Sequence, residues 1–337
     1  MDLQQSLFAL SRAVGPSGIE GPAVQTAREL LAPLVDETAV DAMGNLTGLR
    51  RGSGTGRRIL LDAHLDEVSL VVTGQKEGYL SFACLGIDAR LLPALTVSVL
   101  TQPPMPGVIT CLPPHVLTAE EREQPFDVEK LYIDCGLTEE QAKAVPIGTR
   151  VAYDTEPVML RNGAVSGKSL DNRAGFAVLL RTMELLRDKP LPVDVVVLGS
   201  VQEEFSGLGA RTGAFAQMPD AALVVDVTFA SQPDAPKSGT FALGSGPAIG
   251  VGPELHRRIS DKLRALAPEA SVEVLPGSTG TNATETQTAR EGIPTGLVSL
   301  PQRYMHTPVE VVRLDDIDAC ARLIADWILS LGEEDAQ

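Results

Sequence analysis

The sequence is poor in histidine, cysteine, tryptophan and positive charge. It has four histidines, four cysteines and one tryptophan in 337 residues. Lys and Arg number 28 against 44 Asp and Glu, which gives a formal net charge of −16. Such a charge repels nucleic-acid phosphates and anionic lipid headgroups. We therefore expect neither nucleic acid nor a membrane among the partners of this chain.

Disulfide scaffolds and long apolar runs are also missing. Cys84, Cys111, Cys135 and Cys320 are scattered, with no CxxC pair, which is typical of structural thiols in a reducing compartment. No segment reaches the roughly 18 apolar residues of a membrane span. The first twenty residues lack the basic region that precedes the apolar part of a signal peptide. These features predict a soluble, cytoplasmic protein.

Predicted strands and helices alternate along the sequence, as they do in an α/β protein. Apolar spacing predicts helices over 2–13 and 22–32. The runs "RRILLDAH" and "PVDVVVLGS" are nearly continuous in apolar residues, as in strands that are buried on both faces of a mainly parallel sheet. Further strands and amphipathic helices alternate towards the C-terminus. This order predicts a three-layer, doubly wound, mainly parallel sheet.

A segment with a different pattern of residues interrupts this alternation of strands and helices. From 68 to 158 the chain has short β-rich pieces between turn signals, and it includes the proline-rich "TQPPMPGVITCLPPH". We therefore expect one α/β domain made of residues 1–67 and 159–337, with a small β domain inserted over 68–158.

Polar residues gather where the apolar runs end. In open α/β sheets, ligands bind outside the carboxyl ends of the strands. The residues just past the apolar runs are His64, Asp66, Glu203, Glu204, Asp226 and His306, and Asp171 stands at the start of the predicted long helix. The pattern brings two imidazoles and several carboxylates to one edge of the sheet.

A metal site explains this crowding of acids. Carboxylates held close together repel each other unless cations neutralise them. Histidine and carboxylate together suit zinc, cobalt or manganese better than calcium or magnesium. Five ligands, one of them a bridging carboxylate, suffice for two divalent ions about 3.5 to 4 Å apart that share a bridging water. Glu203, beside Glu204, is then available as a general base.

Each residue taken alone has a simpler interpretation. A histidine at a strand end is commonly a hydrogen-bonded structural residue, Asp171 could cap a helix, and paired glutamates are commonly solvated. Asp226 differs, because an acid inside an apolar run is costly to bury without a partner. The joint placement of all these residues at the predicted ends of strands and helices favours a functional site.

Several motifs in order give the chain a resemblance to a known family. They are "GPSGIE" at 15, "MGNLTG" at 43, "AHLDEV" at 63, "PPH" at 113, "GKSLDNRAG" at 167, "QEEFSGLGA" at 202, "DVTFA" at 226 and "RYMHTPVE" at 303. With these motifs the chain resembles the tetrahedral aminopeptidases, the glutamyl and leucyl aminopeptidase family of di-zinc exopeptidases, which have also been called cellulases.

The resemblance implies a role for each candidate residue. Asp171 would bridge two metal ions, His64 and Asp226 would complete one site, and Glu204 and His306 the other. Glu203 would be the general base, and Asp66 would orient His64. The resemblance also implies that the inserted domain mediates dimerisation and that dimers assemble into a tetrahedral dodecamer.

Two positions depart from the family pattern. Asn282 stands where aspartate commonly follows threonine, and Ser206 where a glycine usually follows the glutamate pair. Neither matches a metal ligand, so they bear on substrate contacts more than on catalysis. His115 and His256 lie outside the predicted site, His115 in a proline-rich turn and His256 in an amphipathic helix.

Our leading hypothesis is an aminopeptidase that removes N-terminal residues from peptides with two divalent ions, Zn²⁺ before Co²⁺ or Mn²⁺. The alternative is a metal-dependent amidohydrolase acting on N-acyl amino acids or other small amides, because fold alone does not fix the substrate. A non-catalytic subunit would not need the full ligand set. A glycosidase needs two carboxyl groups and no metal, and four tyrosines and one tryptophan offer little surface for sugar stacking.

Overall fold

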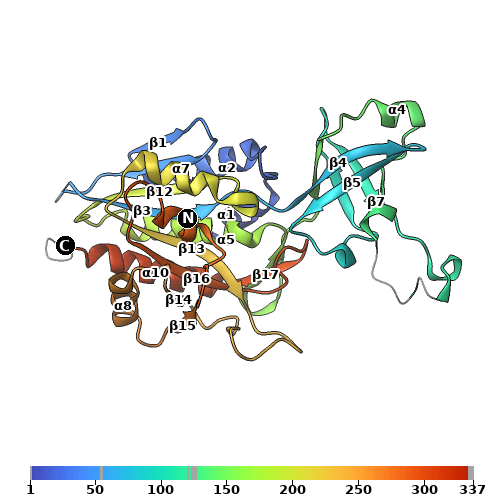
Figure 1. The fold of residues 1–337 in the computed structure, drawn as a ribbon. Helices are drawn as coiled ribbons and strands as arrows, with labels where there is room; N and C mark the ends of the chain where they lie inside the picture. The colour runs from blue at the N-terminus through green and yellow to red at the C-terminus, as the bar shows by residue number, and fades with distance from the viewer. Residues whose placement is uncertain (1, 54–55, 120–121, 123–126, 333–337) are drawn as a thin grey trace. The chain divides into compact units, whose positions relative to one another are not determined.

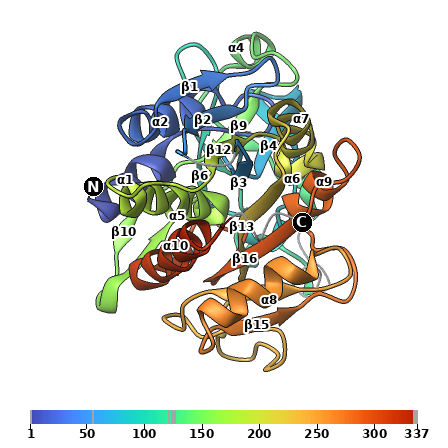
Figure 2. The ribbon, with the colours of Figure 1, turned by 90° about the vertical axis from the view of Figure 1, so that its left-hand side faces the viewer.

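The structure, a computed structural model, describes residues 2–53, 56–119, 122 and 127–332. The chain forms two compact units (Figures 1 and 2). The larger comprises Met1–Glu67, Pro157–Met305 and Val309–Gln337, and the smaller comprises Val68–Glu156 with His306–Pro308. Within the described ranges, no helix is both long enough and apolar enough to cross a membrane.

The larger unit is built on a mixed sheet. Its order is β1-β2-β12-β3-β13-β16-β14-β15. The strands are β1 (Glu37–Val40), β2 (Leu46–Arg50), β3 (Arg58–His64), β12 (Asp194–Ser200), β13 (Ala221–Phe229), β14 (Ala248–Val251), β15 (Ser271–Val274) and β16 (Thr295–Gln302). The four central strands β12, β3, β13 and β16 are parallel, whereas β2 and β14 join them antiparallel. The fold is therefore mixed α/β, as predicted.

The helices predicted over 2–13 and 22–32 are present, and the helix expected around His256 begins later than its sequence suggests. The described helices of this unit are α1 (Leu3–Arg12), α2 (Gly21–Leu31), η1 (Ala32–Leu34), η5 (Arg161–Gly163), α5 (Leu170–Leu186), α6 (Glu203–Ser206), α7 (Leu208–Gln217), α8 (Arg257–Leu266), α9 (Asn282–Gln287) and α10 (Leu314–Leu329). We expected the amphipathic helix α8 to include His256. It begins at Arg257 instead, because the His256 N–H donates to the Thr295 carbonyl at 2.8 Å and ties the chain to β16 first.

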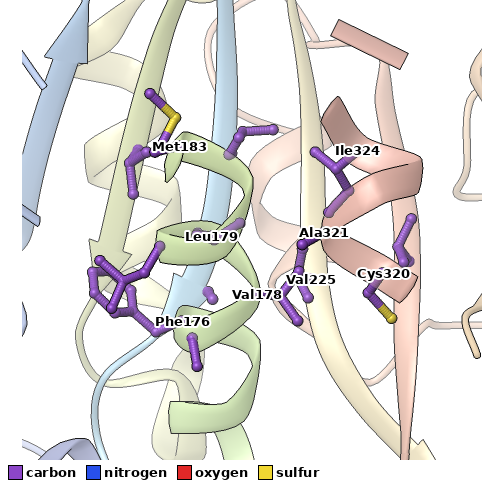
Figure 3. Packing of buried hydrophobic residues seen from close by; sticks show 14 of the residues in the cluster. Phe176, Val178, Leu179, Met183, Val225, Cys320, Ala321 and Ile324 are labelled. Carbon is purple, nitrogen blue, oxygen red and sulfur yellow. The ribbon is translucent and has the colours of Figure 1, made fainter. Parts of the chain in front are cut away.

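Both faces of the central strands are buried, which explains their continuous apolar runs. On one face, Val225 of β13 packs with Phe176 of α5 and Ile324 of α10 (Figure 3). On the other face, Leu60 of β3 packs with Ala214 of α7. Successive residues of a strand point to opposite faces, so helices must cover both.

A short second sheet leads into α5. It consists of β10 (Val158–Met159), β11 (Ala164–Gly167) and β17 (Glu310–Arg313), paired antiparallel. Gly167 pairs with Glu310 in this sheet. That register sets the Glu310 carboxylate beside the start of α5.

The smaller unit has its own core. Strands β4 (Ser69–Lys76), β5 (Tyr79–Leu85), β6 (Thr96–Val99), β7 (Met105–Ile109), β8 (Ile133–Asp134) and β9 (Arg150–Tyr153) close into a barrel in the order β4-β5-β8-β7-β6-β9. Its described helices are η2 (Ala89–Leu91), η3 (Pro114–Val116), η4 (Val128–Lys130) and α4 (Glu139–Lys143). Val72, Leu80, Val97 and Val151 are fully buried inside. This segment is β-rich, as its turn-rich sequence suggests.

Candidate metal centre

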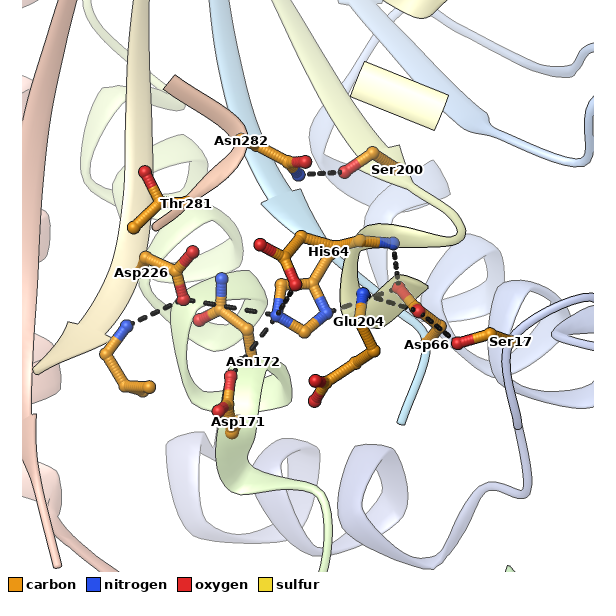
Figure 4. A network of polar contacts seen from close by, with 12 residues as sticks. Ser17, His64, Asp66, Asp171, Asn172, Ser200, Glu204, Asp226, Thr281 and Asn282 are labelled. Carbon is orange, nitrogen blue, oxygen red and sulfur yellow. Dashed lines mark hydrogen bonds and ion pairs between the residues drawn. The ribbon is translucent and has the colours of Figure 1, made fainter. Parts of the chain in front are cut away.

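His64 is the last residue of β3 and the centre of a buried acidic cluster in the larger unit (Figure 4). Its side chain is almost fully buried. His64 Nε2 lies 3.2 Å from Asp171 Oδ1 and 4.0 Å from Asp226 Oδ1. One potential ligand atom from each of these three residues falls within 4.8 Å of the others. These three side chains, predicted from separate parts of the sequence, therefore meet at one point.

Asp171 reaches this point through an irregular start of α5. Its own backbone is extended, with φ −79° and ψ 106°, and Ser169 before it is left-handed at φ 57°. The Asp171 N–H donates to Glu310 Oε2 at 3.0 Å. The N-cap position of α5 belongs to Ser169 and not to Asp171, which the simpler interpretation made the cap. Its carboxylate instead faces His64.

Asp226 lies inside a strand, not beyond its end. The sequence placed it just past the run "ALVV", but β13 continues to Phe229 because residues through Phe229 still pair with β16. The residue is 4% exposed, and Asp226 Oδ1 accepts the Val227 N–H at 2.8 Å. One backbone hydrogen bond and the contact with His64 therefore offset only part of the predicted cost of burying this acid.

Glu203 and Glu204 open the short helix α6, with two residues between it and the end of β12. Glu203 Oε2 lies 3.8 Å from His64 Nε2. Carboxylate oxygens of Glu204 and Asp171 lie within 4.8 Å of each other. The two adjacent glutamates thus add to the cluster, Glu203 beside His64 and Glu204 beside Asp171.

Asp66 fixes the positions of its neighbours. Its Oδ1 lies 3.3 Å from His64 Nδ1 and accepts the Glu203 N–H at 2.9 Å. Its Oδ2 accepts the Glu204 N–H at 3.1 Å and the Ser17 hydroxyl at 2.6 Å. A carboxylate on Nδ1 orients an imidazole so that Nε2 faces a ligand. Here the same carboxylate also holds the backbone of the glutamate pair.

The electrostatics of the cluster favour a bound cation. Burial raises the pKa of Asp226 well above its ordinary value; His64 opposes the rise, and Glu203 and Asp171 add to it. Burial also raises the pKa of Glu203 to about 8, helped by Glu204 and Asp171 and opposed by His64. Burial alone would lower the pKa of His64, but Glu203, Asp171 and Asp66 raise it well above its usual range. The cluster has more negative charge than its one imidazole can neutralise.

These side chains fit a divalent ion. His64, Asp171 and Asp226 offer one imidazole and two carboxylates, the ligand types of zinc and related metals. Each is buried, and their ligand atoms are within 4.8 Å of one another. An ion there would neutralise the carboxylates whose pKa values burial raises.

His306, the second predicted histidine ligand, belongs to the segment His306–Pro308 of the smaller unit. Its ring Nδ1 lies 2.8 Å from the Gly86 carbonyl oxygen, and its own carbonyl accepts the Tyr153 hydroxyl at 3.4 Å. Its backbone is left-handed at φ 63°. A carbonyl acceptor on Nδ1 makes that atom the donor and turns Nε2 into a possible ligand atom.

Strand β3 carries a buried acid that was not among the predicted site residues. Asp62 is fully buried two residues before His64, so both side chains point to the same face of the strand. Burial raises its pKa to about 7, against the effect of nearby Ser200 and Asn282. Asn282, one of the two departures from the family pattern, is also buried and donates to Ser200 Oγ at 2.9 Å. The rule that singled out Asp226, an acid within an apolar run, also applies to Asp62.

A buried ion pair, also missed, supports the start of α5. Lys168 Nζ lies 2.7 Å from Glu67 Oε2, and both side chains are buried. Glu67 Oε1 accepts the Gly15 N–H at 2.7 Å, and Ser169 also donates to Glu67. These contacts link "GPSGIE", "AHLDEV" and "GKSLDNRAG" around Asp171. The residues are too far apart in sequence for spacing to reveal the pair.

Comparison with known proteins identifies the family. The family model described as M42 glutamyl aminopeptidase matches residues 44–323. The chain belongs to the M42 glutamyl aminopeptidase family. It is therefore an aminopeptidase-type hydrolase, as predicted, and M42 peptidases depend on metal ions.

Relatives of this M42 chain match along nearly its whole length. The lysyl aminopeptidase of Pyrococcus furiosus is 31% identical over 88% of this chain and 87% of its own. A TET aminopeptidase from a marine sediment Thaumarchaeota archaeon superposes with a TM-score of 0.92 at 29% identity, over 98% of this chain and 97% of its own. The TET1 peptidase of Pyrococcus horikoshii superposes with a TM-score of 0.85 at 29% identity, over 98% and 100%.

Proposed function

We propose that this M42 chain removes N-terminal residues from peptides at a two-metal centre formed by the acidic cluster. One observation carries the proposal: His64, Asp171 and Asp226 bring three ligand atoms within 4.8 Å of one another, while Glu203 Oε2 lies 3.8 Å from His64 Nε2. A set of metal ligands with an adjacent carboxylate that is not itself one of the three ligands suits the activation of a water for hydrolysis.

His64 and Asp226 would hold one ion, Glu204 and His306 the other, and Asp171 would contact both. Zn²⁺ is our first expectation, with Co²⁺ and Mn²⁺ as alternatives, because these metals share imidazole and carboxylate ligands. When bound, such a pair lowers the pKa of a water and polarises the scissile carbonyl. The three-layer, doubly wound form of the sheet is part of this proposal, because it gathers strand ends at one edge.

The side chains of the cluster transfer the proton, position each other and attract the substrate amine. Glu203 takes a proton from the attacking water on its carboxylate and returns it to the leaving amine. Asp66 holds the His64 ring and the Glu203 backbone in position through its contacts with them at 3.3 and 2.9 Å. The surplus of buried carboxylates attracts the protonated amine of a peptide N-terminus. An N-acylated substrate lacks that charge, which favours the aminopeptidase over the amidohydrolase.

A substrate panel tests the proposal. We expect the protein reconstituted with Zn²⁺, Co²⁺ or Mn²⁺ to hydrolyse aminoacyl-p-nitroanilides and to leave the matching N-acetyl-aminoacyl-p-nitroanilides and N-acetyl amino acids intact. Release of nitroaniline and of free amino acid are the measurements. If only the N-acetyl compounds were hydrolysed, the protein would be an amidohydrolase and not an aminopeptidase.

We also propose that the inserted domain, predicted over 68–158, mediates dimerisation and that dimers assemble into a tetrahedral dodecamer. The closed barrel with its own core supports an independent module, and the similar TET1 peptidase of Pyrococcus horikoshii can assemble into a tetrahedron or a large octahedral shell. Size-exclusion chromatography with light scattering should give twelve times the 35.6 kDa chain mass. A single species at the mass of one chain would refute the assembly.

A further inference from the structure

Three buried polar side chains lie next to the candidate metal ligands on one face of the central sheet. They are Asp62 of β3, Ser200 of β12 and Asn282 of α9, and each is at most 1% exposed. In the parallel register of β12 and β3, Ser200 pairs with His64 and Leu198 pairs with Asp62. Side chains two positions apart on a strand share a face, so Asp62 and His64 point the same way, about 7 Å apart along β3. Asp62 is therefore directly behind a candidate metal ligand.

The surroundings of Asp62 do little to stabilise a carboxylate. Within the described ranges, neither of its carboxylate oxygens accepts a hydrogen bond. Its neighbours on the adjacent strands, Leu198 and Val224, are apolar and fully buried. Burial raises the pKa of this carboxyl, and Ser200 and Asn282 oppose the rise. A buried acid with so few partners is costly, so the charge at this position calls for a functional reason.

Asn282 places an amide next to this acid. Its Nδ2 donates to Ser200 Oγ at 2.9 Å (Figure 4). An amide has a second N–H to offer, whereas an ionised aspartate at the same position would have only acceptors. Because α9 packs against β3, a carboxylate at 282 would lie near that of Asp62, and the two charges would repel each other. The chain therefore has one acid and one amide in this contact, and one negative charge.

This contact gives a physical reason for the departure from the family pattern at position 282. The pattern commonly has aspartate there, and this chain has Asn282 on α9 with Asp62 facing it from β3. We expected the departure to bear on substrate contacts. Asn282 is instead 1% exposed and bound to Ser200 inside the protein. An acid on either element would put a single negative charge behind His64.

We propose that Asp62 carries the buried negative charge that the family pattern assigns to position 282, and that this charge strengthens metal binding at His64 and Asp226. Asp62 acts through its charge and not as a ligand, so it is a positioning residue for the metal ion. A carboxylate attracts a divalent cation in the protein interior without touching it. The effect on the metal rests on the proposed two-metal centre, whereas the exchange of charge between positions 62 and 282 does not.

Moving the charge between the two positions tests the proposal. Asp62→Asn leaves no carboxylate in the contact, Asn282→Asp leaves two, and the double variant Asp62→Asn/Asn282→Asp leaves one, like the wild type. All four proteins are measured at one alkaline pH, so that the carboxylates are ionised. In the metal-free proteins, Asn282→Asp should lower the Tm by about 4 °C or more, because two buried like charges repel each other. The double variant should recover most of that loss.

Zn²⁺ affinity, measured by competition with a chelating dye, provides the second readout. Partners behind a metal ligand contribute about 10- to 100-fold to metal affinity, so Asp62→Asn should weaken Zn²⁺ binding about tenfold or more. The double variant should bind within about threefold of the wild type. A merely structural role of the two side chains predicts the opposite, namely losses that add in the double variant. Glu291→Gln removes one exposed charge of the larger unit; it should change neither readout and should not rescue Asn282→Asp.

The outcomes separate this inference from the proposed function. The inference is overturned if the double variant is no more stable than Asn282→Asp, or if Asp62→Asn binds Zn²⁺ as tightly as the wild type. If Asn282→Asp is too unstable to purify, recovery of folded protein in the double variant supports the inference, and continued failure overturns it. A wild type that binds no Zn²⁺ would overturn the proposed metal centre and the effect of Asp62 on it. The Tm comparison would then still decide whether positions 62 and 282 share one charge.

Discussion

Replacing Glu203 with glutamine is expected to lower kcat on aminoacyl-p-nitroanilides about 100-fold or more while metal content stays near that of the wild type. General-base groups contribute about 10²- to 10⁴-fold to rates. Glutamine keeps the size of the side chain and the backbone N–H that donates to Asp66 Oδ1 at 2.9 Å, but it cannot take a proton from water. The loss should therefore fall on kcat, with KM little changed.

Metal analysis and steady-state kinetics on the same preparation check this result. Glu291→Gln is the matched control, because Glu291 is exposed on the larger unit and lies outside the cluster. It should keep wild-type kinetics. Full activity in Glu203→Gln would remove Glu203 from the mechanism, and a parallel loss of metal would make it a ligand instead of a base.

Replacing Asp171 with asparagine is expected to abolish both metal binding and hydrolysis. In the proposal Asp171 is the one carboxylate shared by the two ions, so an amide there removes a negative charge from both sites. The backbone N–H bond to Glu310 at 3.0 Å does not depend on the side chain, so the start of α5 should keep its conformation. Elemental analysis of the purified variant should find markedly less than the wild-type metal per chain.

Thermal unfolding distinguishes this outcome from misfolding. In the metal-free protein Asp171 raises the pKa of both Glu203 and Asp226, so removing its charge relieves repulsion, but it also weakens the 3.2 Å contact with His64. These two effects oppose each other, so metal-free Asp171→Asn should have a Tm close to that of the metal-free wild type. Added Zn²⁺ should raise the Tm of the wild type by mass action but not that of the variant. A wild-type response to Zn²⁺ in the variant would show that Asp171 is not required for binding.

The sequence predicts those metal ligands that directly follow or interrupt an apolar strand. His64 and Glu203 come after apolar runs, and the parallel order of the central strands carries those ends to one edge. Asp226 was recognised because an acid is costly within an apolar strand, although the strand proved longer than its apolar part. The antiparallel attachment of β2 and β14, which flank the four parallel strands, was not expected, since the direction of a strand leaves no signal in its sequence.

Contacts between distant segments were beyond sequence reasoning. Asp66 was expected to orient His64, but its bonds to the backbone N–H groups of Glu203 and Glu204 depend on how the loop after β12 returns to β3. The Glu67–Lys168 pair likewise depends on packing, because 101 residues separate the partners. Asp62 could have been found by the rule applied to Asp226, and its neighbours Ser200 and Asn282 could not.

Glu67 sets a practical limit for anyone who replaces the barrel with a short linker. It is the last residue of the larger unit before the smaller one begins at Val68. Its buried carboxylate binds Lys168 and the Gly15 N–H, so a deletion that includes it would leave a lysine buried without its counter-charge, a change that costs about 3–5 kcal/mol. A chain without the barrel should therefore be joined between Glu67 and Pro157, because a cut made directly after Asp66 would keep His64 and Asp66 and still lose this support.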